Sequence, residues 1–216
     1  MSTVVIADIV GSRRLSDRAA AQIALEETIA RVEGEQPFAE RALTPTVGDE
    51  LQGVYPDLTA ALKALLLLQL ALPDGLECRF GIGLGDIEPL PSTADELTDG
   101  PGWWAARAAI ERVHALQQRA APSARTWVDV AEGADNDDVR SRVAFANAYL
   151  LARDQLVGAM SERTRRLVYG RCIGRTQRAL AEAEGITQSA VSQALAGAGA
   201  GAILEGFAIL TDGSRS

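Results

Sequence analysis

The run Thr3–Gly11 (TVVIADIVG) decides the predicted fold, because it is apolar, rich in β-branched residues and closed by a glycine. Its first seven residues predict a strand buried in a sheet. Working outward from this run, hydrophobic spacing and turn residues predict a helix, two strands, a helix and a strand, over Ser16–Val32, Ala42–Val47, Glu50–Tyr55, Leu58–Leu72 and Glu77–Leu84. The pair Gly48-Asp49 between the two strands is typical of a tight hairpin.

This order, β-α-β-β-α-β, is the split βαβ arrangement, an α+β fold in which an antiparallel sheet carries helices on one face. A further helix over Trp103–Arg119 and a short strand over Arg125–Val130 complete the predicted palm-like domain, residues 1–131. The acidic sequence EGADNDD lacks large apolar residues, so we expect a linker over residues 132–140. Residues 141–216 have helical patterns throughout and predict an all-α domain.

The composition limits the class of protein. The chain has 216 residues, 47% of them hydrophobic and 23% charged, which is typical of a globular protein of one or two domains. The single histidine, His114, excludes a multi-histidine metal centre, and two cysteines predict no disulfide framework. The longest apolar stretch, Ala60–Leu72, is shorter than the roughly 20 residues that span a bilayer, and the N-terminus has no signal-peptide pattern. We therefore expect a cytoplasmic protein with no membrane partner.

Charge is unevenly distributed along the chain. The 21 basic and 29 acidic residues give a net charge of −8. Residues 1–158 hold 14 basic and 24 acidic side chains, whereas residues 159–216 hold 7 and 5. An acidic body with a basic C-terminal region indicates two roles, one of which involves a polyanion.

Two aspartates are expected to meet at one edge of the sheet. Asp8 ends the first strand and Asp49 lies in the hairpin before the third. In the split βαβ topology these strands are antiparallel neighbours, so the two carboxylates would repel each other unless a cation lay between them. Hard oxygen ligands of this kind suit Mg²⁺ or Mn²⁺, often together with substrate phosphates. The alternative is that both are ordinary turn residues.

The loop after the first strand is a candidate phosphate site. It combines backbone N–H groups, a flexible glycine and two arginines just ahead of a predicted helix N-terminus. The residues of this site are Gly11, Ser12, Arg13 and Arg14.

Trp103 and Trp104 begin the next predicted helix after the sheet. Adjacent positions on a helix face different ways. We expect at least one of these rings in the core, while the other could stack on a base.

The sequence QRALAEAEGITQSAVSQAL, residues 177–195, has the spacing of a helix-turn-helix. Gly185 suits the left-handed turn after the first helix. The cap and exposed positions of the second helix suit base edges in a major groove, which gives the predicted DNA-reading set Thr187, Gln188, Ser189, Ser192 and Gln193. The arginines expected to contact phosphates are Arg165, Arg166, Arg175 and Arg178. The alternative is a helical hairpin used only for packing.

Three segments resemble the landmarks of class III nucleotide cyclases, namely Ala7–Gly11 (ADIVG), Thr46–Glu50 (TVGDE) and Arg79–Gly85 (RFGIGLG). In that family two aspartates bind two metal ions, and the resemblance carries this role to Asp8 and Asp49. It also implies that Arg107 stabilises the transition state. Trp103 stands where the family has an asparagine, and no counterpart of its purine-reading lysine is found.

The cyclase-like first half and the C-terminal GITQSAVS motif together resemble the bacterial SatD family over most of the chain. This resemblance implies a cytoplasmic bacterial protein and assigns no substrate. Our main interpretation is a homodimeric regulator that binds double-stranded DNA and senses a nucleotide or metal ion through its N-terminal domain. The alternative is an active nucleotide cyclase or nucleotidyltransferase that uses Mg²⁺ or Mn²⁺ at Asp8 and Asp49. A third hypothesis is a DNA-binding protein whose N-terminal domain is purely structural and serves for dimerisation.

Overall fold

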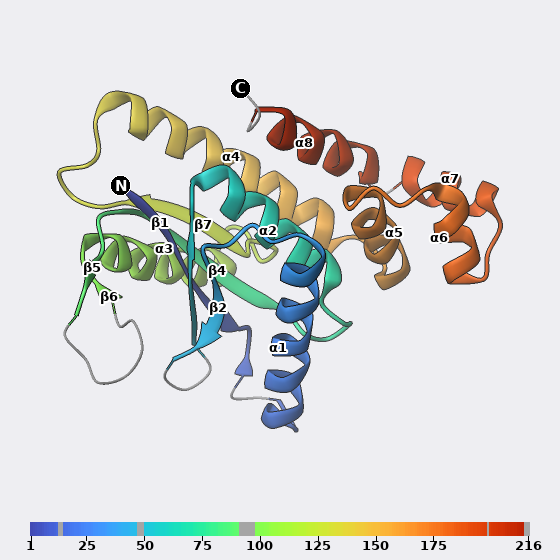
Figure 1. Ribbon diagram of the computed structural model, residues 1–216, viewed down its shortest axis with the longest axis horizontal. Coiled ribbons are helices and arrows are strands. Elements are labelled where there is room, and N and C mark those ends of the chain that lie inside the picture. Colours follow the sequence, from blue (N-terminus) through green and yellow to red (C-terminus); the bar gives the residue numbers. More distant parts are fainter. Residues whose placement is uncertain (13–14, 47–49, 91–97, 198, 214–216) are drawn as a thin grey trace.

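A five-stranded sheet forms the centre of the computed structural model, which describes residues 1–12, 15–46, 50–90, 98–197 and 199–213 (Figure 1). Its strands are β1 (Ser2–Ile9), β2 (Arg41–Pro45), β3 (Leu51–Tyr55), β4 (Cys78–Gly85) and β7 (Thr126–Val130), in the order β2-β3-β1-β4-β7. β1 pairs antiparallel with β3 and β4, whereas β7 pairs parallel with β4. The predicted element order is confirmed, but the sheet is mixed and not wholly antiparallel. Two short strands, β5 (Glu88–Pro89) and β6 (Thr98–Asp99), pair separately.

Helices cover both faces of this sheet, which corrects the expectation of one covered face. α1 (Arg18–Glu35) and α2 (Leu58–Ala71) lie on the face to which the odd-numbered residues of β1 point. α3 (Pro101–Gln117) lies on the other face, against the even-numbered residues Val4 and Ile6. α1 begins at Arg18, two residues after the predicted Ser16, because the Asp17 side chain caps it by accepting a hydrogen bond from the Ala20 amide at 2.9 Å.

A row of glycines lets α3 approach β4 closely. A Cβ atom added at Gly83 would lie 2.0 Å from the carbonyl oxygen of Gly102, and one at Gly81 would lie 2.2 Å from that of Ala106. Both distances are far shorter than any real contact, so side chains at these strand positions would push the helix away. The glycines of the RFGIGLG segment therefore fix the position of α3 and of every side chain that α3 carries.

Five helices follow the sheet, namely α4 (Asp137–Gly158), α5 (Glu162–Cys172), α6 (Gln177–Glu184), α7 (Gln188–Ala196) and α8 (Ala200–Asp212). Two of them, α5 and α8, pack on α2, which is why α2 is apolar on the side away from the sheet as well. Leu66, Leu67 and Leu70 of α2 share one buried cluster with Leu167 of α5 and Phe207 of α8. Figure 1 shows α5, α6 and α7 gathered at one end of the molecule.

α4 is joined to the sheet by buried polar contacts. Asn147 brackets Val128 of β7, accepting from its amide at 2.8 Å and donating to its carbonyl at 2.9 Å. Asp154 accepts from the amides of Arg125 and Thr126 at 2.6 and 2.8 Å. The predicted linker, residues 132–140, includes the first turn of α4, and the division into domains at this point stays a prediction.

Among the described residues, no single helix has both the length and the apolarity to cross a membrane. α7 and α8 meet that criterion only as a pair bent by 81°.

Candidate functional site

The register of the sheet places Asp8, Arg79 and Glu50 at neighbouring positions on three adjacent strands. Asp8 pairs directly with Arg79 of β4. β1 and β3 pair as far as Ala7 and Leu51, so the next position places Asp8 beside Glu50. Side chains alternate along a strand, and the other even-numbered residues of β1 pack against α3. The three charged side chains therefore lie on the α3 face of the sheet, at the end where β1 stops and β3 and β4 begin. We call this end of the sheet the Asp8 edge.

Asp8 forms a bidentate ion pair with Arg79. The Arg79 Nε atom donates to Oδ1 at 2.8 Å and Nη2 donates to Oδ2 at 3.0 Å, so both carboxylate oxygens are engaged. The remaining nitrogen, Nη1, donates to His114 Nδ1 at 2.8 Å and to Gln117 Oε1 at 3.4 Å. Arg79 thus links the carboxylate at the end of β1 to the C-terminal half of α3.

Glu50 forms a second ion pair, with Arg107 of α3. The Arg107 Nη1 and Nη2 atoms lie 2.6 and 2.7 Å from the two Glu50 oxygens. This hydrogen bonding raises the pKa of Arg107, against a smaller opposing effect of burial. The Arg107 side chain is nevertheless 48% exposed, so the pair is open to solvent and can be exchanged at a cost of about 1 kcal/mol or less.

The described residues supply two carboxylates to the predicted metal site, Asp8 and Glu50. Asp49, the predicted partner of Asp8, lies outside the described residues. The electrostatic reason for expecting a cation is weakened, since Arg79 and Arg107 neutralise the two carboxylates. Within the described ranges no group of three or more His, Cys, Asp or Glu side chains is arranged to hold a metal ion.

A hollow of about 340 Å³ opens beside Arg107. Its walls are Ile6, Gln52, Thr98, Asp99, Trp103, Trp104 and Arg107. Trp103 is buried and its Nε1 donates to Thr98 Oγ1 at 3.1 Å, whereas Trp104 is 64% exposed. The prediction that at least one of the two rings is in the core is confirmed, and Trp104 is the ring that a planar ligand could reach.

The predicted phosphate loop is only partly described. Gly11 has a positive φ of 68°, and it lines a second hollow with Ser12, Asp8 and Arg79. Arg13 and Arg14 lie outside the described residues. The N-terminus of α1 is capped by the Asp17 carboxylate, which occupies the end of the helix where an anion would bind. The assignment of phosphate to this loop stays a prediction.

Sequence reasoning missed two members of this edge, Arg79 and Glu50, as site residues. Both stand inside quoted motifs, directly after Cys78 and directly after Asp49. Counting the antiparallel register from the hairpin would have placed Glu50 beside Asp8, and the strand pairing of β1 with β4 would have placed Arg79 there.

The predicted DNA-reading segment has the local structure that its sequence indicates. Gly185 adopts the left-handed conformation, the Thr187 side chain caps α7, and Gln188, Ser189, Ser192 and Gln193 are exposed. The four arginines expected to bind phosphates are instead paired with carboxylates of the same chain. These pairs are Arg165–Asp74, Arg166–Glu184, Arg175–Glu35 and Arg178–Glu182, at 2.8, 2.8, 2.9 and 3.1 Å.

Comparison with known proteins gives one family and a set of distant structures. A family model described as the SatD family matches residues 3–204. An adenylate cyclase from Trypanosoma brucei, in its monomeric state, is 20% identical over 52% of this chain and 68% of its own, with a TM-score of 0.42. A bacterial light-regulated adenylyl cyclase is 13% identical over 56% and 71%, with a TM-score of 0.41. The guanylyl cyclase domain of a RhoGC fusion protein from the aquatic fungus Blastocladiella emersonii is 17% identical over 51% and 72%, with a TM-score of 0.40. A search of curated proteins finds no match.

The interpretation as a DNA-binding regulator is wrong. The family model matches residues 3–204 as one unit, with the predicted DNA-reading segment inside it, and it describes that unit as the SatD family. The physical reason for the error is the basic C-terminal stretch, whose arginines are neutralised in place by acidic side chains. A separate helix-turn-helix domain is not seen either, since α5 and α8 share their core with α2.

Proposed function

The chain belongs to the SatD family, and we propose that its α/β part binds a nucleoside triphosphate with a divalent cation and acts on it as a nucleotide cyclase or nucleotidyltransferase. One observation carries the proposal. The register of the sheet sets the carboxylates of Asp8 and Glu50 side by side on the α3 face, beside an exchangeable arginine and an open indole ring.

The side chains at this edge are of the chemical type that binds a hard cation. Asp8 and Glu50 offer the carboxylate oxygens that Mg²⁺ and Mn²⁺ prefer. Because each is held by an arginine, a cation would replace Arg79 and Arg107 as their partner. The exposed Glu50–Arg107 pair yields most easily, and its exchange would free the Arg107 guanidinium to bind phosphate oxygens. When bound, the cation would polarise the phosphoryl oxygens.

The residues of this chain would bind and orient the nucleotide. Arg107 would neutralise phosphate charge, and the exposed ring of Trp104 would stack on the base. In the cyclase reaction a ribose hydroxyl oxygen bonds to the α-phosphorus, diphosphate leaves and the hydroxyl proton passes to solvent. In nucleotidyl transfer the attacking hydroxyl belongs to a second molecule.

The rate of this reaction is expected to be low. Trp103 is buried and its only N–H is bound to Thr98, so it cannot donate to a phosphate oxygen. The loss of one donor to a transition state costs about 10²–10³ in rate.

An assay of diphosphate release with Mn²⁺ and ATP or GTP tests the proposal. The variants Asp8→Asn and Glu50→Gln should each lose the activity, because each removes one carboxylate charge without changing shape. Asp86→Asn is the matched control, since this exposed carboxylate lies just beyond the other end of β4, where it pairs with the N-terminal amine. Product identified as a cyclic nucleotide or as a nucleotidylated acceptor decides between the two reactions. Wild-type protein without activity on either nucleotide, or variants that keep it, would refute the proposal.

A further inference from the structure

Large apolar side chains are exposed on two neighbouring helices, α4 and α8, which lie along one side of the molecule (Figure 1). Phe145 of α4 is 77% exposed and Ile209 of α8 is 71% exposed. These are the highest values among the large apolar side chains that the structure describes. Exposed apolar surface gathered in one place marks an interaction site.

α4 and α8 run antiparallel, which places the two exposed side chains at the same level. A Cβ atom added at Gly206 would lie 3.7 Å from the Tyr149 ring, and one added at Gly199 would lie 2.6 Å from the Leu156 side chain. α8 therefore passes α4 in the opposite direction. The exposed phenylalanine precedes Tyr149 by four residues and the exposed isoleucine follows Gly206 by three, so both lie about one helical turn beyond the same contact.

The exposed side of α4 is free of charge over most of its length. Arg142 is the last exposed charged residue of the helix, because Arg153 and Asp154 are buried. The exposed positions after Arg142 are Ala144, Phe145, Ala148, Ala152, Gln155 and Gly158. We call the surface made by these six residues and Ile209 the α4/α8 face. Its alanines, spaced four residues apart, let a second helix approach closely.

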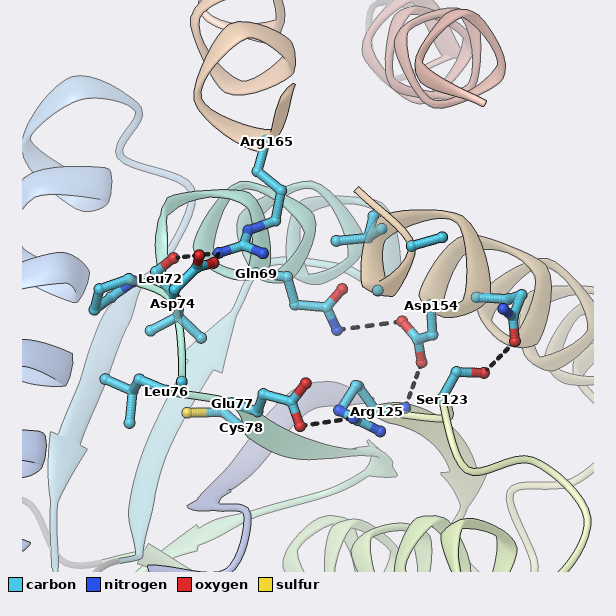
Figure 2. Close-up of a pocket in the computed structure, with 16 residues that line it drawn as sticks. Gln69, Leu72, Asp74, Leu76, Glu77, Cys78, Ser123, Arg125, Asp154 and Arg165 are labelled. Atoms are coloured by element: carbon cyan, nitrogen blue, oxygen red, sulfur yellow. Dashed lines mark hydrogen bonds and ion pairs between the residues drawn. The ribbon is translucent and has the colours of Figure 1, made fainter. Parts of the chain in front are cut away.

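The buried side of α4 is held to the rest of the protein by polar contacts. Figure 2 shows Asp154 of α4 bonded both to Gln69 of α2 and to Arg125, just before β7. The Gln69 Nε2 atom donates to Asp154 at 3.2 Å and the Arg125 amide donates to it at 2.6 Å. These contacts fix the rotation of α4 about its own axis, so its charge-free side stays turned toward solvent in the single chain.

Charge favours a second copy of this chain as the partner. The chain has a net charge of −8, so two copies repel each other in general and approach most easily where charge is absent. The exposed side of α4 meets this condition. An anionic lipid surface is disfavoured, because the exposed charges of α8 are the acidic residues Glu205 and Asp212, whereas helices that lie on membranes carry basic residues.

The size of the α4/α8 face suits a reversible pair. α4 has 22 residues and α8 has 13. Treated as cylinders about 10 Å wide that rise about 1.5 Å per residue, they present roughly 500 Å². Two copies would bury about 1,000 Å² in total, which is the size at which specific interfaces begin.

We propose that two copies of this chain pair through the α4/α8 face, with a two-fold axis near Ala148. In such a contact the same residues meet from both sides, so Phe145 of each copy packs over the alanines of the other. The pairing does not depend on the proposed function. Leu150 of α4 shares a core cluster with Val5 and other odd-numbered residues of β1, so α4 lies on the opposite face of the sheet from α3 and the Asp8 edge.

Sedimentation equilibrium of the full chain tests the pairing. The wild type should fit a reversible equilibrium between the 22.8 kDa chain and its dimer. Phe145→Glu and Ile209→Glu should each raise the dissociation constant about tenfold or more, because each would bury an unpaired charge. Ile23→Glu is the matched control, since it places the same charge at a 57% exposed isoleucine of α1, outside this face. It should leave the dissociation constant unchanged.

A cysteine placed near the two-fold axis tests the geometry without adding charge. A short bismaleimide should join Ala148→Cys to a second copy, because residues beside a two-fold axis lie close to their own symmetry mates. Ile23→Cys, on α1, should not be joined. The wild type should not be joined either, since neither Cys78 nor Cys172 is exposed.

Three results would overturn the proposal: a wild type that stays monomeric at about 100 µM, a Phe145→Glu variant that pairs as strongly as the wild type, or an Ala148→Cys variant that is not joined. A fourth concerns lipid. Wild-type protein that binds vesicles of phosphatidylcholine and phosphatidylglycerol through Phe145, with no dimer in solution, would assign the face to a membrane and overturn the pairing.

Discussion

Replacing Gly83 by alanine should destabilise the protein by forcing α3 off the sheet. The new Cβ atom would lie 2.0 Å from the Gly102 carbonyl oxygen and 2.5 Å from the Ala106 amide nitrogen. Ordinary contacts begin at 3.4 Å, so strand and helix must separate by about 1.4 Å, the difference between 3.4 and 2.0 Å. Both neighbours are backbone atoms and cannot swing aside. Overpacking of a well-packed core costs about 1–3 kcal/mol, and we expect a loss near the upper end.

Urea unfolding followed by circular dichroism measures this loss. Gly34→Ala is the control, because Gly34 lies near the end of α1 with no atom within 4 Å of an added Cβ. Alanine there should stabilise the protein by up to about 1 kcal/mol, the difference in helix propensity. A Gly83→Ala variant within about 0.5 kcal/mol of the wild type would refute the argument that these glycines set the position of α3.

Three further predictions follow from buried groups and from the surface. Asp154→Asn should lower the free energy of unfolding in urea by about 3–5 kcal/mol, because it leaves the buried charge of Arg153 uncompensated. The control is Asp138→Asn, which breaks an exposed pair with Arg142 and should lower it by less than about 1 kcal/mol. Burial raises the pKa of the Cys172 thiol to about 12 and raises the pKa of Cys78 as well, so at pH 8 almost none of either thiol is the reactive thiolate. Ellman's reagent at pH 8 should therefore label neither cysteine until urea is added, and labelling of the folded protein would contradict this account. The predicted homodimer should sediment at twice the chain mass of 22.8 kDa at micromolar concentration, and a species of 22.8 kDa would contradict it.

The order of elements could be predicted because each carries its own local signal. The β-branched run of β1, the Asp17 cap and the apolar α2 each specify one element without reference to the rest. The position of β7 beside β4, and of α3 on the second face, could not be predicted in this way. The position of α3 depends on the row of glycines in β4, whose meaning appears only when a helix lies on it, and the position of β7 depends on the edge of β4 that β1 leaves unpaired.

The candidate site could be predicted only in part, because one of its residues has a local signal in the sequence and the others do not. Asp8 stands at the end of an obvious strand, so its place at the sheet edge follows from sequence. Arg79 and Glu50 reach Asp8 only through the register of three strands. The misreading of the C-terminal arginines has a related cause. Glu35, the partner of Arg175, is 140 residues away in sequence, so the basic stretch looked free to bind DNA.

The most direct test of the central claim is an anomalous-scattering map of crystals soaked with Mn²⁺ and a non-hydrolysable ATP analogue. The account predicts a manganese peak between the carboxylates of Asp8 and Glu50, with Arg107 moved from Glu50 to a phosphate oxygen. A map in which both carboxylates keep their arginine partners, with no manganese between them, would contradict it.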